Sequence, residues 1–212
     1  MRVFIFLHGA DKETFLKLKP KIEEPIICAD SGIKLAMDLP YKPKSIILIG
    51  DLDSVSKQDL DWCKKNNISM KKYPENKDFT DGELALQYAC KKFVSKHPKI
   101  ILGGVSSLMD HTLGNILSTV PFVEEGHKIS FSVKNQTVYL MKDKLKLNNC
   151  KGHTVSLIPL VKTEIISTSG LEWELKKEKI LPYKSRTLRN EAIENNVKIE
   201  IKEGLVIVVE SW

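Results

Sequence analysis

Short runs of apolar residues alternate with segments of helical spacing through the first 125 residues of the chain. The apolar runs are nearly continuous, which is typical of strands that are buried on both faces of a sheet. They cover residues 3–7, 26–29, 46–49 and 99–102, and the helical segments cover 33–39, 57–66, 81–96 and 111–123. This alternation predicts an α/β domain with a mostly parallel sheet between helices.

The pattern changes near Glu124-Glu125-Gly126. The later apolar segments are short, rich in β-branched residues and often alternating, and turn signals such as Lys151-Gly152 and Glu203-Gly204 separate them. They cover residues 128–133, 137–141, 153–160, 163–168, 197–202 and 205–210. We therefore expect an α/β domain over residues 1–125, followed by an all-β C-terminal sandwich or barrel over residues 126–212.

Charge, hydrophobicity and cysteine spacing argue against a nucleic-acid-binding protein, a membrane protein and a disulfide-bonded protein. The net charge is +6, from 33 Lys and Arg against 27 Asp and Glu, and the lysines are scattered. Scattered lysine is typical of a solvated surface and disfavours a nucleic-acid-binding patch. No run approaches the roughly 20 apolar residues of a membrane span. The four cysteines show no CxxC spacing, which favours free thiols in a reducing cytoplasm.

Four aspartate-bearing motifs lie at or just beyond the ends of predicted strands or at the start of predicted helices. They are Ala-Asp-Ser-Gly at 29–32, Gly-Asp-Leu-Asp-Ser at 50–54, Asn-Lys-Asp-Phe-Thr-Asp at 76–81 and Asp-His-Thr-Leu-Gly-Asn at 110–115. A parallel sheet brings strand ends to one edge, where open α/β folds bind ligands. Converging carboxylates repel one another and need a cation, and an oxygen-only ligand set favours Mg²⁺ over zinc. The sequence therefore predicts a metal-nucleotide enzyme.

Helix capping is a structural alternative for two of these motifs. Asp53 or Ser54 can cap the helix that follows, but capping does not require both Asp51 and Asp53, so we favour a metal site there.

Thr80 with Glu83 three residues later matches a capping box, so these two residues have a structural explanation. Asp78 and Asp81 lie at the positive end of the same predicted helix, where anions and their metals are readily held. Lys77 is a candidate phosphate contact, although a single lysine more often faces solvent.

Three further features have two explanations each. The loop Gly103-Gly104-Val105-Ser106-Ser107 follows a strand and could cradle a phosphate with its amides. His111 has no second histidine at ligand spacing, which favours a hydrogen bond to protein or nucleotide over metal binding. Trp173 lies in a polar stretch, where it serves either as core or as a stacking face for a heteroaromatic cation.

In this order, the motifs resemble those of the thiamine pyrophosphokinase family. The resemblance runs through residues 29–32, 50–54, 77–81 and 110–115 and ends with Gly-Leu-Glu-Trp at 170–173, so it covers nearly the whole chain. It implies an ATP-binding α/β domain, a thiamine-binding β domain, Mg²⁺, and a homodimer with active sites at the subunit interface. The implied reaction is transfer of pyrophosphate from ATP to thiamine, which gives thiamine diphosphate and AMP.

The resemblance also implies roles for individual residues. Asp51, Asp53 and Asp81 would bind the metal, and Asp30, Asp51 and Asp81 would form the catalytic group, with either Asp30 or Asp81 acting on the thiamine hydroxyl. The implied nucleotide-binding residues are Asp78, Thr80, Asp110, His111 and Asn115, and the implied thiamine-binding residues are Trp173 and Asn190.

Two positions depart from the family pattern. Leu108 stands where the family usually has arginine before the Asp-His pair, and Arg189 replaces the serine of a late Ser-Asn pair. Three other classes stay open. A Mg²⁺-dependent phosphatase or phosphotransferase could use the same acidic residues, and a nucleic-acid-binding module would suit the net charge of +6. The missing arginine leaves open an inactive thiamine sensor.

Overall fold

The computed structural model describes residues 1–104 and 108–212 and divides the chain into two compact units, Met1–Lys134 and Asn135–Trp212. Each unit has its own hydrophobic core and its own strand arrangement. Among the described residues, no helix is long and apolar enough to cross a membrane.

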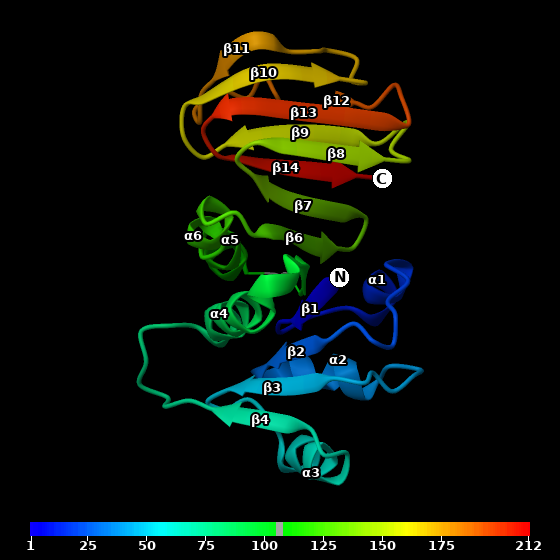
Figure 1. Cartoon of the computed structure of the whole chain (residues 1–212), viewed down its shortest axis with the longest axis vertical. Helices are drawn as coiled ribbons and strands as arrows, with labels where there is room; N and C mark the ends of the chain where they lie inside the picture. Colours follow the sequence, from blue (N-terminus) through cyan, green and yellow to red (C-terminus); the bar gives the residue numbers. More distant parts are fainter. Residues whose placement is uncertain (105–107) are drawn as a thin grey trace. The chain divides into compact units, whose positions relative to one another are not determined.

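The first unit is built on parallel strands in the order β6-β5-β1-β2-β3-β4. Figure 1 shows strands β1 to β4 side by side in the blue to cyan part of the chain. The strands are β1 (Arg2–Phe6), β2 (Ile26–Ala29), β3 (Ile46–Gly50), β4 (Ser69–Lys72), β5 (Lys99–Gly103) and β6 (Lys128–Val133). The helices are α1 (Lys12–Lys17), η1 (Asp30–Gly32), α2 (Ile33–Met37), α3 (Lys57–Lys65), α4 (Asp81–Phe93), η2 (Val94–Lys96), α5 (Met109–Leu117) and α6 (Val120–Glu124).

Helices cover this sheet on both faces. Strand β2 is buried at every position, and successive side chains of a strand point to opposite faces, so both faces must be covered. On one face Phe15 of α1 packs edge-on against Phe4 and Phe6, with ring centroids 4.9 and 4.8 Å apart. Helix α4 packs against β1, β2 and β3. The prediction of an α/β domain with a mostly parallel sheet is confirmed.

Strand β4 is absent from the predicted elements because its sequence carries no apolar run. Its residues Ser-Met-Lys-Lys are all exposed, and it forms the outer strand of the sheet beside β3. An edge strand with polar side chains is a common way to discourage pairing with other chains. Hydrophobic periodicity therefore gives no signal for it.

The second unit is a sandwich of antiparallel strands. One layer has the order β12-β9-β14-β7 and the other β11-β10-β13-β8. Val208 of one layer and Ile199 of the other belong to a single buried cluster, which confirms the predicted all-β sandwich. The strands are β7 (Gln136–Met141), β8 (Lys144–Asn148), β9 (Thr154–Pro159), β10 (Thr163–Ser169), β11 (Lys176–Ile180), β12 (Asn190–Glu191), β13 (Asn196–Glu203) and β14 (Val206–Ser211).

The first unit extends further than residue 125, the end of the domain expected from the sequence. It ends at Lys134 because strand β6 pairs in parallel with β5 and so continues the parallel sheet. Residues 128–133 do form a strand, as their sequence pattern predicts, but this strand pairs with β5 of the α/β unit.

Candidate active site

Three of the predicted aspartates meet at the carboxyl edge of the parallel sheet. Asp30 follows β2, Asp51 follows β3, and Asp81 begins α4. A carboxylate oxygen from each lies within 4.8 Å of the other two, and we call this group the acidic cluster. Strands β2 and β3 are adjacent and parallel, so their carboxyl ends deliver the first two side chains to the same place.

The backbone around Asp30 is specialised for this position. Asp30 has a left-handed φ of 44° and is only 8% exposed. Its carboxylate accepts hydrogen bonds from Leu52 N at 3.1 Å and from Ser54 Oγ at 3.3 Å. A non-glycine residue in this conformation is strained, and such strain concentrates at functional sites.

Because Gly50 has no side chain, the carboxylates of the acidic cluster can lie close to its backbone. A Cβ at this position would lie 1.8 Å from Asp30 Oδ1 and 3.2 Å from Asp81 Cγ. Any side chain here would displace the carboxylate of Asp30, so the cluster requires glycine at this position.

Lys77 is the cation of the cluster in this structure. Its Nζ lies 2.5 Å from Asp51 Oδ2 and 3.0 Å from Asp81 Oδ1, and its side chain is 12% exposed. Although burial acts in the opposite direction, these contacts raise the pKa of Lys77 above its usual range. The ammonium group is therefore held in its charged form.

The carboxylates of the cluster differ in acidity. Burial raises the pKa of Asp30 to about 6, and the charges of Asp81 and Asp51 act in the same direction. The hydrogen bond from Lys77 lowers the pKa of Asp51, supported by the backbone N–H of Asp53. The pKa of Asp30 is thus raised toward neutral pH, whereas that of Asp51 is lowered, so Asp51 stays ionised. Carboxyl groups with pKa values shifted in this way are found at catalytic sites.

The donor set of the acidic cluster is suited to Mg²⁺. It consists of carboxylate oxygens, the ligand type that Mg²⁺ prefers. Asp81 Oδ1 is buried and, among the described residues, accepts no hydrogen bond of good geometry. Asp53, predicted as a metal ligand, lies outside this group of three and is exposed, and its N–H donates to Asp51 Oδ1 at 3.2 Å.

Three of the predicted nucleotide-binding residues lie at the starts of two helices. Thr80 caps α4, and Thr80 and Glu83 form the capping box that the sequence predicts. Asp110 and His111 lie in the first turn of α5, where Asp110 Oδ1 accepts a hydrogen bond from His111 N at 2.8 Å.

The remaining nucleotide candidates are divided between exposed and half-buried positions. Asp78 is exposed, and Asn115 is half-buried. Asn115 Oδ1 lies 3.7 Å from the position of a Cβ on Gly82, so the side of α5 approaches the start of α4. Val105, Ser106 and Ser107 of the predicted phosphate loop lie outside the described residues.

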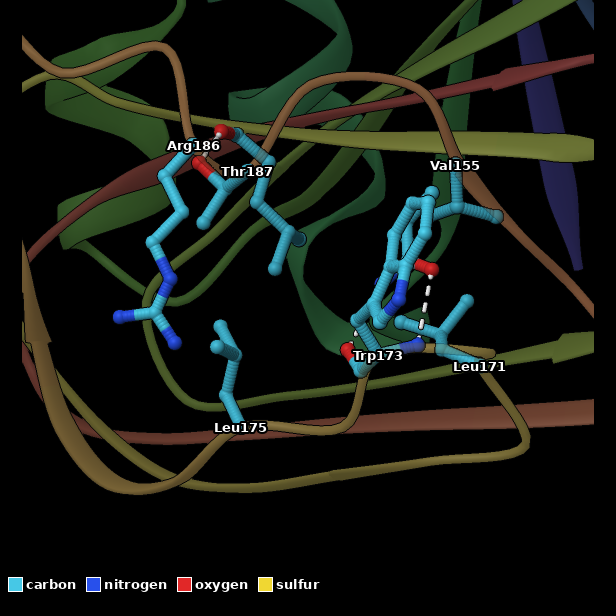
Figure 2. Close-up of a pocket in the computed structure, with 8 residues that line it drawn as sticks. Val155, Leu171, Trp173, Leu175, Arg186 and Thr187 are labelled. Carbon is cyan, nitrogen blue, oxygen red and sulfur yellow. Dashed lines mark hydrogen bonds between the residues drawn. The ribbon is translucent and has the colours of Figure 1, made fainter.

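The second unit contains a pocket of about 220 Å³. Its polar and aromatic lining is contributed by Trp173, Arg186, Thr187 and Asn190, and the rest of the lining is aliphatic. Figure 2 shows the indole of Trp173 and the guanidinium of Arg186 on opposite sides of the pocket. Trp173 is 62% exposed, which contradicts a core role and leaves its ring accessible to a ligand.

Asn190 holds the backbone of Trp173. Asn190 Oδ1 accepts from Trp173 N at 3.1 Å, and Asn190 Nδ2 donates to Trp173 O at 2.8 Å. The neighbouring Arg189 has a left-handed φ of 54°, and its N–H donates to Ser156 Oγ at 2.9 Å. Asn190 thus fixes the loop that presents the indole.

Arg186 is a pocket residue that the sequence pattern did not identify. Its guanidinium forms a two-pronged pair with Glu178, with Nη1 and Nη2 at 2.6 and 3.3 Å from the two carboxylate oxygens. Glu178 belongs to β11, a strand whose charged sequence carries no periodic signal. Only the fold brings the two side chains together.

Comparison with known protein families accounts for both units. Residues 20–131 match the family described as "Thiamin pyrophosphokinase, catalytic domain", and residues 139–206 match "Thiamin pyrophosphokinase, vitamin B1 binding domain". The chain belongs to the thiamine pyrophosphokinase family. It is therefore an ATP-dependent pyrophosphotransferase, as the resemblance of its motifs implies.

Individual relatives of this family are similar over most of their length. The thiamine pyrophosphokinase of Bacillus subtilis (strain 168) is 26% identical over 191 residues, which are 87% of this chain and 86% of that protein. Thiamin pyrophosphokinase 1 of Caenorhabditis elegans is 25% identical over 177 residues, which are 78% of this chain and 71% of that protein.

Solved structures of thiamine pyrophosphokinases share the fold. The Bacillus subtilis structure has a TM-score of 0.82 at 21% identity and covers 99% of each chain. The Candida albicans structure has a TM-score of 0.78 at 17% identity and covers 100% of this chain and 89% of that one.

Leu108, which departs from the family pattern, occupies the N-cap position of α5 and is 57% exposed. A leucine side chain cannot supply the charge of the arginine that the family usually has here.

Proposed function

We propose that the α/β unit binds ATP and Mg²⁺ and that the β unit binds thiamine, so that the chain transfers pyrophosphate from ATP to thiamine. The observation that carries this proposal is the convergence of Asp30, Asp51 and Asp81 at the carboxyl edge of the sheet. The two family matches support the division of labour, because one describes a catalytic domain and the other a vitamin B1-binding domain.

Asp51 and Asp81 are the residues that would hold Mg²⁺, with Asp30 beside them. When bound, the metal would neutralise charge on the polyphosphate and align it for in-line displacement. Asp53 would act indirectly, since its N–H already orients the carboxylate of Asp51.

Asp30 is the residue that we propose accepts the proton of the thiamine hydroxyl. Leu52 N and Ser54 Oγ orient its carboxylate, and its pKa of about 6 is close to the range where a general base is most effective. The hydroxyl oxygen forms a bond to the β-phosphorus of ATP. The bond from this phosphorus to the oxygen bridging to the α-phosphate breaks, and AMP leaves with the electron pair.

We further propose that five residues contact the nucleotide: Asp78 and Thr80, which lead into α4, Asp110 and His111 in the first turn of α5, and Asn115 further along α5. Helix N-termini favour anions because their N–H groups are unpaired and the helix dipole is positive there.

Trp173 is the proposed stacking face for the thiamine ring system. Thiamine carries a heteroaromatic cation, and an exposed indole attracts such a cation through the negative face of its ring. Glu178 supports this role because its carboxylate balances the charge of Arg186 in the same pocket. Asn190 contributes by holding Trp173 in place.

We propose a cytoplasmic homodimer in which a second copy completes the active site. The cytoplasmic location rests on the four cysteines, which are free and buried, as is usual in a reducing compartment. Sedimentation analysis tests the dimer, because a monomer at enzyme-assay concentrations contradicts it.

An assay with ATP, Mg²⁺ and thiamine tests the function, with thiamine diphosphate and AMP followed together. We expect the two products in equal amounts. Release of ADP or phosphate without thiamine would favour the phosphatase class, and thiamine binding without product would favour a sensor.

Asp51→Asn is expected to reduce turnover at least about a hundredfold, because it removes a carboxylate from the proposed metal site. Asp61→Asn makes the same chemical change on the exposed surface of α3 and serves as the control. Near-normal turnover in Asp51→Asn would remove this residue from the metal site.

A further inference from the structure

Lys77 lies between two carboxylates that would help to hold a metal ion. Its Nζ pairs with Asp51 Oδ2 and with Asp81 Oδ1, and all three side chains are mostly buried, with 12%, 11% and 22% exposure. A single ammonium group thus partly neutralises the acidic cluster from within the chain.

The position of Lys77 in the chain allows it to leave this place. It belongs to the segment between β4 and α4, outside any helix or strand, and lysine has a flexible four-carbon stem with several rotatable bonds. Asp81 itself starts α4, which is fixed by the capping box of Thr80 and Glu83, and Asp51 follows β3 directly. The carboxylates are therefore held by the fold, whereas the ammonium group is the movable partner.

A divalent cation and the ammonium group of Lys77 cannot occupy the same space. Both take their favourable energy from the same two carboxylates, so each weakens the binding of the other. Asp81 Oδ1 is buried, and Lys77 Nζ at 3.0 Å is its partner in an ion pair, so loss of this ammonium group leaves the oxygen in need of another cation.

We propose that Lys77 is a built-in counter-ion that holds the acidic cluster in the metal-free enzyme and is displaced by the divalent cation. This inference rests on the proposed metal site at Asp51 and Asp81. Lys77 is then a positioning residue that preserves the cluster before loading and lowers the affinity for free metal. After displacement its charge is free to contact the polyphosphate.

Calorimetric titration of the ATP-free enzyme with Mn²⁺ tests this proposal. Lys77→Met is expected to bind Mn²⁺ at least about fivefold more tightly than the wild type, because the competing cation is gone. Lys77→Arg keeps the positive charge and is expected to retain the weak binding. Lys92→Met removes the same charge from an exposed position of α4, roughly 16 Å along the helix from Asp81, and is the matched control.

Thermal melting in the presence of a chelator gives a second readout. Lys77→Met is expected to melt below the wild type, since the cluster loses its counter-ion, and Mn²⁺ should restore the melting temperature more than it raises that of the wild type. If Lys77→Met does not fold, Lys77→Gln keeps hydrogen-bonding capacity without the charge and replaces it in both measurements.

The outcomes separate this proposal from the proposed function. Equal Mn²⁺ affinity in wild type and Lys77→Met overturns the counter-ion role. Asp51→Asn is titrated in parallel with Mn²⁺ and α,β-methylene ATP, an analogue that resists cleavage between the α- and β-phosphates. Unchanged Mn²⁺ affinity in Asp51→Asn contradicts the metal site itself, whereas reduced affinity there combined with no effect of Lys77→Met refutes only the role of Lys77.

Discussion

The side-chain amide of Asn190 holds the backbone of Trp173 from both sides, with Oδ1 accepting from its N–H at 3.1 Å and Nδ2 donating to its carbonyl at 2.8 Å. The two residues are far apart in the sequence, yet their pairing fixes the loop that carries the exposed indole. In the proposed function, Asn190 would therefore contribute to thiamine binding by positioning Trp173.

Asn190→Ala is expected to raise the KM for thiamine about tenfold with little change in kcat. Each lost hydrogen bond contributes about 1 kcal/mol, and the indole loses its fixed orientation. Steady-state kinetics with varied thiamine provide the measurement. Asn148→Ala removes the same side chain from an exposed position of β8 and should leave KM unchanged. A large loss of kcat with unchanged KM in Asn190→Ala would argue against the positioning role.

Gly50→Ala is expected to reduce turnover at least about a hundredfold while the protein stays folded. The new methyl group would overlap the carboxylate of Asp30, whose Oδ1 lies 1.8 Å from the Cβ position, and misplacement of a catalytic group by about 1 Å can have this effect. Circular dichroism and steady-state kinetics measure the two properties.

The control for this change is Gly126→Ala. Gly126 has a left-handed φ of 95° and no atom within 4 Å of its Cβ position, so alanine there introduces backbone strain without a clash. If both variants lose activity equally, general strain and not displacement of Asp30 is the cause.

Asp30→Asn is expected to stabilise the metal-free enzyme at neutral pH. The folded state raises the pKa of Asp30 from 3.8 to about 6, so the folded state binds this proton more tightly than the unfolded chain. The free energy of unfolding therefore falls as the pH rises from 3.8 to about 6. Above this range, ionised Asp30 lowers the free energy of unfolding by roughly 3 kcal/mol. Asparagine avoids this cost and also tolerates the left-handed backbone at position 30.

Urea unfolding in the presence of a chelator tests this at about pH 4.5 and about pH 8. We expect the stability advantage of Asp30→Asn over the wild type to be small at the lower pH and large at the higher pH, with activity lost at both. If the difference in stability between Asp30→Asn and the wild type is the same at both pH values, ionisation of Asp30 does not destabilise the fold.

Thr80→Ala is expected to lower stability by about 1 kcal/mol, because it removes the N-cap of α4. Ser56→Ala removes the equivalent cap of α3, whose capping box with Asp59 is built in the same way. Both variants should lose similar stability in urea unfolding, but only Thr80→Ala should raise the KM for ATP. Equal KM values in the two variants would leave Thr80 with a capping role alone.

The sequence predicts those strands that are buried, and it does so because burial on both faces requires continuous apolar residues. This pattern predicts strands β1, β2, β3 and β5. It does not predict β4 and β11, because most of their residues are polar and exposed. The capping box of Thr80 and Glu83 was also predictable, since it depends on residues only three positions apart.

The sequence by itself determined the types of chemistry: aspartates at strand ends, a metal-binding class of ligand, and motifs in the order of the family to which the chain belongs. Only the tertiary structure decided which of these residues meet. It grouped Asp30 with Asp51 and Asp81, placed Lys77 between two of them, and paired Arg186 with Glu178. These contacts join segments that are distant in the chain, and their distances depend on strand order and register, which no local pattern of side chains encodes.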